Sequence, residues 1–264
     1  MTYCVAISSQ SGLVFCSDSR TNAGADMLST YSKMHLFTPA SDRLFVLLTA
    51  GNLATTQAIV SRIEHELDDP EAKKSLLTCK KMSEAATYVS DINREEQTKA
   101  QTATTGAKID TSASLIFGGQ VKGGAPAIYL MYAAGNFIAD SDETAFLQIG
   151  ESKYGKPILD RIITRKTTLE DAARCALVSM DSTIKSNATV GPPIEVMVYE
   201  KDSFESNHYL RLNEDDEYLR SIRQSWNEAL NSAFAALPPL EWEKRTASAS
   251  NNIHPIIHDS PTKG

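Results

Sequence analysis

The sequence predicts an α+β domain whose sheets are mainly antiparallel. Segments with strand character and segments with helix character come in separate runs, in the order strands, two helices, strands, two helices, strands, helix. A Rossmann fold would instead alternate single strands with single helices. The sequence shows no internal repeat and no heptad array. With 264 residues, 42% of them hydrophobic, the chain is long enough for one large domain and an appendage.

Four strands are expected at the start of the chain. Residues 3–8 and 13–19 are rich in strand-forming residues, and a turn at 10–12 predicts that they form an antiparallel hairpin. A second pair of strands is expected at 35–38 and 44–50, separated by a short turn-like segment. Four strands therefore precede the first helix.

Helical periodicity begins after Gly51-Asn52. Apolar residues at helical spacing predict one helix from Leu53 onward and a second that ends before the polar stretch at 97–105. The segment Thr167-Thr168-Leu169-Glu170 resembles a capping box and predicts a helix from about 168 to 185. The remaining expected elements are strands at 113–117, 127–132, 145–150, 194–199 and 208–212, and a last helix through Tyr218 and Phe234.

Composition marks a boundary near the end of the sequence. From Lys244 onward Ser, Asn, Thr and Pro dominate, which predicts a flexible tail at 244–264. We expect residues 1–243 to form a single domain, in which 214–243 make a C-terminal helical extension. Aromatic residues in this extension offer a candidate surface for assembly, and packing within one chain explains them equally well.

The net charge and the cysteines limit which ligands the protein can bind and in which cellular compartment it is expected. The formal net charge of −7 argues against a general nucleic-acid or anionic-membrane surface, because no strong basic field attracts phosphates. The four cysteines form no CxxC pair and are expected as buried free thiols in a reducing compartment. The sequence has no recognisable secretion signal and no apolar stretch near the ~20 residues that cross a bilayer. We therefore expect a cytoplasmic protein.

No motif predicts a metal or a cofactor. The five histidines form no HExxH pattern and do not cluster with the cysteines. The glycine pairs at 118–119 and 123–124 match no phosphate-binding or dinucleotide fingerprint, so we expect them in a hairpin connection. Peptides, small molecules and protein partners remain as ligands.

Thr2 is the principal candidate for chemistry. Because residue 2 is small, Met1 is expected to be removed readily. Its removal would leave a hydroxyl and a free α-amine on one residue. An α-amine with a pKa of about 7.7 to 8.0 can accept the hydroxyl proton at neutral pH. If Asp18 holds Lys33 as an ammonium, that cation lowers the pKa of both groups of Thr2. Taken singly, a frayed terminus explains Thr2, and solvated surface positions explain Asp18 and Lys33.

Taken together, four sequence features resemble a proteasome β-subunit. They are Thr2, Ser17-Asp18-Ser19-Arg20, Lys33 and Thr49-Ala50-Gly51. The resemblance spans residues 2–199, and the segments at 19–24 and 180–183 resemble the bacterial ancestral β-subunit (Anbu) group of proteasome-type peptidases.

The resemblance implies a four-layer αββα sandwich in which Thr2 forms a threonyl ester that water hydrolyses. Asp18 and Lys33 would activate Thr2, the Gly51 N–H would stabilise the oxyanion, and Ser152 would lie near the terminal amine. A strand-to-helix turn also explains Gly51, and a helix cap also explains Ser152. The other implied residues are Arg20, Asp181 and Ser186 in support, and Thr21, Asn22, Thr49 and Leu53 in substrate binding.

Two departures from the family pattern affect this assignment. Lys33 follows Asp18 by 15 positions, one fewer than in typical β-subunits, so the connecting loop must absorb a deletion. Val190-Gly191-Pro192-Pro193 replaces the usual Ser-Gly-Gly, which puts the alignment of Asp181 and Ser186 in question.

Three functions fit these observations. The first is a threonine peptidase that cuts peptides or unfolded chains inside a homo-oligomeric ring or ring-like spiral. The second is an N-terminal-nucleophile amidase that acts on a small amide. The third is a catalytically silent scaffold. In it, either Met1 is retained and a peptide bond blocks the α-amine, or the shortened loop displaces Lys33. No nucleic-acid or membrane partner is expected, and the sequence does not indicate whether an ATP-dependent unfoldase takes part.

Overall fold

The computed structural model describes residues 2–22, 28–104 and 109–242. The chain divides into two compact units, one that ends at Arg223 and one that starts at Gln224, and the fold below is that of the first unit. The expected tail at 244–264 lies outside the described residues.

Two five-stranded antiparallel sheets form the centre of this unit. The first has the order β10 (Phe146–Gly150), β1 (Tyr3–Ser9), β2 (Gly12–Asp18), β11 (Ile194–Glu200) and β12 (His208–Leu212). The second has the order β5 (Met34–Ala40), β6 (Arg43–Gly51), β7 (Ala113–Val121), β8 (Ala127–Met131) and β9 (Phe137–Ala139). A small ribbon pairs β3 (Arg20–Asn22) with β4 (Leu28–Thr30).

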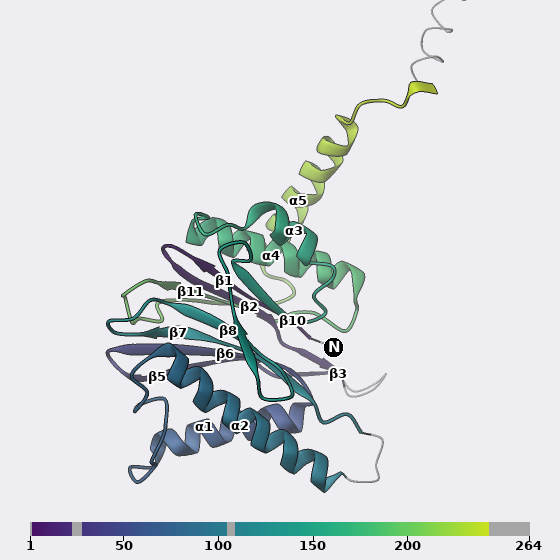
Figure 1. Cartoon of the computed structure of the whole chain (residues 1–264). Coiled ribbons are helices and arrows are strands. Elements are labelled where there is room, and N and C mark those ends of the chain that lie inside the picture. The colour runs from purple at the N-terminus through teal and green to yellow at the C-terminus, as the bar shows by residue number, and fades with distance from the viewer. Residues whose placement is uncertain (1, 23–27, 105–108, 243–264) are drawn as a thin grey trace, which may run out of the picture. The chain divides into compact units, whose positions relative to one another are not determined.

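Helices cover the outer face of each sheet. Figure 1 shows α3 (Lys156–Ile162) and α4 (Leu169–Ser186) on one side of the two sheets and α1 (Leu53–Asp68) and α2 (Met82–Ala103) on the other. The hydrophobic core accordingly falls into three clusters, one between the sheets and one beneath each helical layer. The predicted α+β class and the four-layer αββα sandwich are confirmed.

The layers explain why β1 and β2 are buried along their whole length and are mostly apolar. Tyr3, Val5 and Ile7 contribute to the cluster beneath α3 and α4, whereas Cys4 and Ala6 contribute to the cluster between the sheets. A strand buried on both faces shows no alternation of polar and apolar residues. The hairpin register pairs Cys4 with Ser17, and this brings the end of β2 beside the start of β1.

The predicted end of the second helix is wrong, because α2 continues through the polar stretch to Ala103. Gln97 is buried inside the fold, where its Nε2 donates to Asn93 Oδ1 at 2.8 Å and to the Ala113 carbonyl at 3.2 Å. The Ala113 N–H donates in return to Gln97 Oε1 at 3.0 Å. The bonds with Ala113 are tertiary, whereas Asn93 lies one turn earlier in α2, and together these bonds satisfy an amide that the sequence alone places on a surface.

The predicted place of Gly118-Gly119 is also wrong, because both residues lie within β7. A Cβ on Gly118 would come within 2.8 Å of the Phe15 ring and the Ile128 side chain, so glycine makes room for the contact between the sheets. The Gly123-Gly124 pair does lie in the turn between β7 and β8. Strand β9 and the short helix α3 were not specifically predicted from the sequence.

The later helices lie close to their expected bounds. Helix α4 starts one residue later than the capping-box pattern indicates, since Thr168 is the N-cap and accepts from the Asp171 N–H. Helix α5 (Glu217–Ala235) spans the boundary between the two units, so the proposed extension at 214–243 begins in the first unit. Among the described helices, none combines the length and apolar character needed to cross a membrane.

Candidate active site

A buried ion pair joins the two sheets at one end of the sandwich. Asp18, the last residue of β2, is fully buried, and Lys33, which directly precedes β5, is 6% exposed. Lys33 Nζ lies 2.8 Å from Asp18 Oδ1 and also donates to the Arg20 carbonyl at 2.7 Å. A buried ion pair is stable only when its remaining hydrogen-bonding capacity is also met. We call these two residues the charged pair.

Backbone amides supply further bonds to the charged pair. The Tyr3 N–H donates to Asp18 Oδ1 at 3.0 Å, and the Gly191 N–H donates to Asp18 Oδ2 at 3.3 Å. Burial raises the pKa of the Asp18 carboxyl, while the Lys33 charge and these hydrogen bonds oppose the rise, and the net direction is upward. The alternative of solvated surface positions is wrong for both Asp18 and Lys33.

Thr2 is fixed by the residues around it and is not a frayed terminus. Its carbonyl accepts from the Glu151 N–H at 2.7 Å, and the next residue, Tyr3, donates to Asp18. Gly150 has a φ of +80°, and a Cβ there would lie 1.9 Å from the Thr2 carbonyl oxygen. The backbone of Gly150 and Glu151 therefore holds Thr2 next to the charged pair.

This contact gives a testable prediction for Gly150. We expect Gly150→Ala to displace Thr2 and to lower the rate at which an electrophile labels it by about 100-fold, because misplacement of a reacting group by ~1 Å has effects of that size. Gly123→Ala is the matched control, since Gly123 has a similar φ of +84° but no atom would lie within 4 Å of a Cβ at that position. Both variants carry backbone strain of about 1 to 2 kcal/mol. Equal labelling rates in the two variants would contradict the prediction.

Ser152 lies in the turn between β10 and α3. Its N–H donates to the Gly150 carbonyl at 3.0 Å, so it belongs to the same turn that holds Thr2. The alternative that Ser152 caps a helix is wrong for α3, because the N-cap of that helix is Gly155.

Gly51 ends β6 at the rim of the site. Its φ is +111°, and a Cβ would lie 2.3 Å from the Ser112 carbonyl oxygen, so the turn requires glycine. Asn52 then caps α1 by accepting from the Thr55 N–H at 3.1 Å. The strand-to-helix turn that also explains Gly51 is therefore present, and Gly51 lines a pocket.

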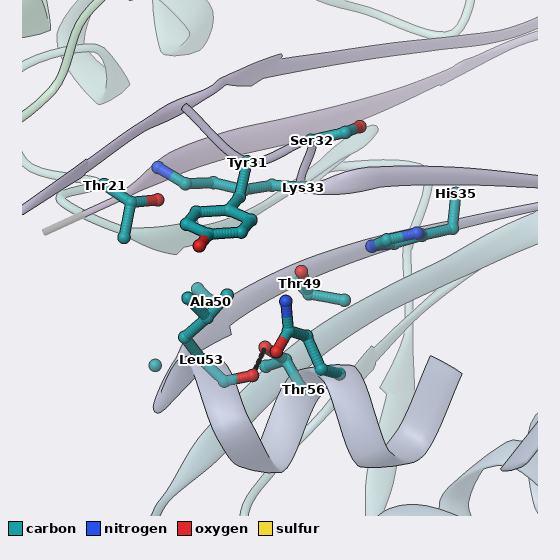
Figure 2. Close-up of a pocket in the computed structure, with 11 residues that line it drawn as sticks. Thr21, Tyr31, Ser32, Lys33, His35, Thr49, Ala50, Leu53 and Thr56 are labelled. Atoms are coloured by element: carbon teal, nitrogen blue, oxygen red, sulfur yellow. Dashed lines mark hydrogen bonds between the residues drawn. The ribbon is translucent and has the colours of Figure 1, made fainter. Parts of the chain in front are cut away.

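A pocket of about 240 Å³ opens beside the charged pair. It brings together five of the predicted site residues, namely Thr21, Lys33, Thr49, Gly51 and Leu53. Figure 2 shows the Tyr31 ring and the Lys33 side chain facing Thr49 and the start of α1 across this space. The side chain of Asn22, the last residue of β3, lies outside the described part of the chain.

The sequence-based prediction missed several residues of this pocket. They are Tyr31, Ser32, His35, Ala50, Thr56 and Gln57. Periodicity carried a signal for some of them, because Tyr31 and His35 stand two positions before and after Lys33, which places all three on one face of an extended segment. Thr56 and Gln57 stand three and four positions after Leu53, on one face of α1.

His35 gives the pocket a titratable group. Desolvation lowers the pKa of its imidazole below the ordinary value of 6.5, and the negative charge of Glu195 opposes this shift. His35 is therefore neutral at pH 7, and among the described residues no Asp or Glu lines the pocket.

Arg20 supports the charged pair through its neighbours. Its N–H donates to the Gly191 carbonyl at 3.2 Å, and its guanidinium donates to the Ala188 carbonyl at 3.0 Å. Gly191 in turn donates to Asp18, and a Cβ at Gly191 would lie 2.2 Å from Arg20 Cζ. The segment that replaces Ser-Gly-Gly thus contacts Asp18 directly.

Asp181 and Ser186 have other surroundings. Asp181 is buried in α4, where its Oδ1 accepts from Arg223 Nε of α5 at 2.6 Å. Ser186 is exposed at the C-terminal end of α4. The supporting roles of Asp181 and Ser186 remain predictions that rest only on the resemblance to proteasome β-subunits.

Two more observations complete the chemistry of the described residues. All four cysteines are free and buried. Within residues 2–22, 28–104 and 109–242, no three His, Cys, Asp or Glu side chains gather as a metal site would require.

Comparison with known proteins places this geometry in a family. The fold is that of the proteasome-type N-terminal-nucleophile hydrolases, and a family model described as "Proteasome subunit" matches residues 2–199. The chain belongs to the proteasome subunit family. A comparison with curated protein sequences gave no match.

Solved structures of Anbu proteins resemble the chain over most of its length. Anbu from Yersinia bercovieri is 47% identical with a TM-score of 0.85, and the match covers 91% of this chain and 100% of that one. A structure described as the helical assembly of the Anbu complex from Pseudomonas aeruginosa is 45% identical with a TM-score of 0.86, covering 90% and 98%. Anbu from Hyphomicrobium sp. strain MC1 is 43% identical with a TM-score of 0.83, covering 91% and 100%. The predicted resemblance to the Anbu group is confirmed.

Proposed function

We propose that this protein is a threonine-type peptidase whose nucleophile is Thr2, exposed by removal of Met1. The observation that carries the proposal is the buried Asp18–Lys33 pair, 2.8 Å apart and hydrogen-bonded to Tyr3, the residue that follows Thr2. A buried ammonium beside a hydroxyl and an α-amine favours the deprotonated form of both groups.

In the first step, Thr2 Oγ attacks the carbonyl carbon of the scissile peptide bond. The α-amine of Thr2 accepts the hydroxyl proton, directly or through a water molecule, and the carbonyl becomes a tetrahedral oxyanion. The Gly51 N–H stabilises this oxyanion, because the absence of a side chain allows close approach. When the C–N bond breaks, the resulting ammonium returns its proton to the leaving amine, and an ester joins the acyl group to Thr2.

In the second step, water hydrolyses the ester. The α-amine, neutral again, takes a proton from the water as its oxygen attacks the ester carbonyl. The bond between the carbonyl carbon and Thr2 Oγ then breaks, and the proton passes to Oγ. The carboxylic acid product leaves, and the hydroxyl and free amine are restored.

The other site residues have positioning and binding roles in this proposal. Asp18 orients Lys33, while Arg20 and the turn at Ser152 hold the segments around Thr2. Thr21, Asn22, Thr49 and Leu53 bind the peptide, with Thr49 and Leu53 shaping the pocket for the side chain before the cleaved bond. Asp181 and Ser186 are proposed to support the site from α4.

The proposed setting is a homo-oligomer in the cytoplasm. The related Anbu complex from Pseudomonas aeruginosa is described as a helical assembly, and this chain is 45% identical to that protein. Four free, buried cysteines suit a reducing compartment. The proposed substrates are peptides or unfolded protein chains that enter the assembly.

A peptide-library assay tests the peptidase function. We expect the protein to release internal fragments from peptides of varied sequence, and Thr2→Ser to retain part of this activity because it keeps the hydroxyl and the amine. Hydrolysis of small amides without cleavage of any peptide would contradict a peptidase and favour an amidase. No turnover of either substrate by protein with a free Thr2 would contradict hydrolysis altogether.

The pocket adds a pH-dependent prediction. Because the pKa of His35 is lowered, the imidazole stays neutral near pH 7 and gains its charge only as the pH falls below the ordinary value of 6.5. We expect the ratio of kcat/KM for a peptide with Glu before the cleaved bond to that for one with Gln to rise as the pH falls below 6.5, by up to about fivefold, as a roughly 1 kcal/mol ion pair gives.

Protonation of the Thr2 amine lowers kcat/KM equally for the two peptides, so the ratio of the two kcat/KM values does not depend on it. His35→Gln, which keeps hydrogen-bonding capacity without a titratable group, is the matched control. A ratio that rises as steeply in His35→Gln as in the wild-type protein would contradict the assignment.

A further inference from the structure

Glu195 is a buried carboxylate that the mechanism above does not use. It lies in β11 between Ile194 and Val196 and is 1% exposed. A buried charge is strongly destabilising unless hydrogen bonds satisfy it, so its neighbours show what it holds in place. The sequence carried one signal, since Glu195 is the one charged residue within the predicted strand at 194–199.

Three hydroxyls and a guanidinium surround this carboxylate. Ser32 Oγ donates to Glu195 Oε2 at 2.8 Å and lies 3.1 Å from Oε1, and Ser19 Oγ donates to Oε2 at 3.0 Å. The Tyr209 hydroxyl donates to Oε1, and Arg211 Nη1 lies 3.6 Å from the same oxygen. Tyr209 and Arg211 belong to the edge strand β12.

Two of these partners are chain neighbours of the charged pair. Ser19 follows Asp18, and Ser32 precedes Lys33. Ladder pairing fixes Glu195 relative to Asp18, because Ile194 of β11 pairs with Asp18 of β2. Lys33 precedes β5, which belongs to the other sheet, so no ladder of the same sheet fixes its distance from Asp18. The bonds from Ser32 to Glu195 span that gap.

Ser32 is oriented for this bond. In Figure 2 its hydroxyl points away from Thr49, whereas the neighbouring Tyr31 ring points into the pocket. Ser32 Oγ also accepts from the Met34 N–H at 3.3 Å, which adds a local bond on the other side of Lys33. The Lys33 backbone is thereby held on both sides.

We propose that Glu195 is a positioning residue that holds Ser32, and through it Lys33, so that the Lys33 ammonium stays on Asp18. It does not line the pocket, so it acts through the charged pair and not on the substrate. The catalytic consequence of this role rests on the proposed function, whereas its geometric consequence does not.

Crystal structures of Glu195→Ala and Ser32→Ala test the geometry independently of any activity. We expect the segment around Ser32 to shift and the Lys33 Nζ to Asp18 Oδ1 distance of 2.8 Å to lengthen beyond hydrogen-bonding range. Ser32→Ala keeps the test decisive if Glu195→Ala does not fold. An unchanged distance in the variants that fold would overturn the proposal.

Kinetics test the catalytic consequence. We expect Glu195→Ala to lower kcat by about 10- to 100-fold per folded molecule, with KM changed less than about twofold, as for a displaced catalytic group. Glu195→Gln should recover part of kcat, because it keeps one acceptor oxygen and the side-chain shape. Ser32→Ala combined with Glu195→Ala should lower kcat no further than Glu195→Ala alone.

Gln120→Ala is the matched control for loss of a buried hydrogen-bonded side chain. Gln120 is fully buried and is hydrogen-bonded to Tyr199 and Asp202. It lies near one end of β7, whereas Gly51 pairs with Ala113 at the other end. Equal kcat values for Glu195→Ala and Gln120→Ala would overturn the positioning role. If wild-type protein with a free Thr2 shows no turnover, the proposed function fails, and the crystal structures still decide whether Glu195 positions Lys33.

Discussion

Lys33→Ala is expected to lower peptide hydrolysis by about 10³-fold or more, because it removes the cation that activates both groups of Thr2 in the proposed mechanism. The same change leaves the Asp18 carboxylate buried without its partner. Breaking a buried ion pair in this way lowers the free energy of unfolding by about 3 to 5 kcal/mol. Denaturant unfolding and peptide hydrolysis on the same samples measure the two effects.

The double variant Asp18→Asn with Lys33→Ala separates stability from chemistry. Removing the uncompensated charge should recover part of the free energy of unfolding, while hydrolysis stays as low as in Lys33→Ala. Lys156→Ala is the control for loss of an ion pair, since Lys156 is exposed and pairs with Asp160 at 2.7 Å. An exposed pair contributes at most about 1 kcal/mol. Recovery of hydrolysis in the double variant would contradict the role of the charged pair.

Thr2→Val is expected to abolish labelling by electrophiles and to lower hydrolysis by about 10⁴-fold or more, in the range seen when a nucleophile is removed. Valine keeps the branched shape of threonine and removes only the hydroxyl. The Thr2 carbonyl still accepts from the Glu151 N–H, so we expect the free energy of unfolding to change by less than about 1 kcal/mol.

Thr2→Ser is the companion variant, because it keeps the hydroxyl in a smaller side chain. Intact mass must show that residue 1 is absent from both variants before their rates are compared. Hydrolysis by Thr2→Val at a rate near that of Thr2→Ser would show that another group is the nucleophile.

The first strands and the position of Asp18 could be predicted because local patterns determine them. The turn at 10–12 sets the β1–β2 register, which pairs Cys4 with Ser17 and places Asp18 beside Tyr3. Burial on both faces makes most residues of these strands apolar, which the sequence shows directly. The link from Lys33 to Asp18 came from the family resemblance, because no local pattern reports a contact between two sheets.

Residues whose roles depend on distant partners escaped prediction. Gln97 appears in a polar run, yet the Asn93 side chain and the Ala113 backbone hold it inside the fold. The sequence alone suggests a turn at Gly118, because it does not show that Phe15 of the other sheet packs against this position. In the sequence Glu195 is only an unexpected charged residue in a strand, because its partners Ser19 and Ser32 are far away along the chain.

The central claim is that Thr2 is an activated N-terminal nucleophile, and intact mass spectrometry tests it most directly. The native protein is measured before and after treatment with a peptide epoxyketone, which reacts with a hydroxyl and an α-amine on the same residue. We predict a mass without Met1 and one stoichiometric adduct, which Thr2→Val does not form. A mass that retains Met1, or a free Thr2 that never forms the adduct, would contradict the claim.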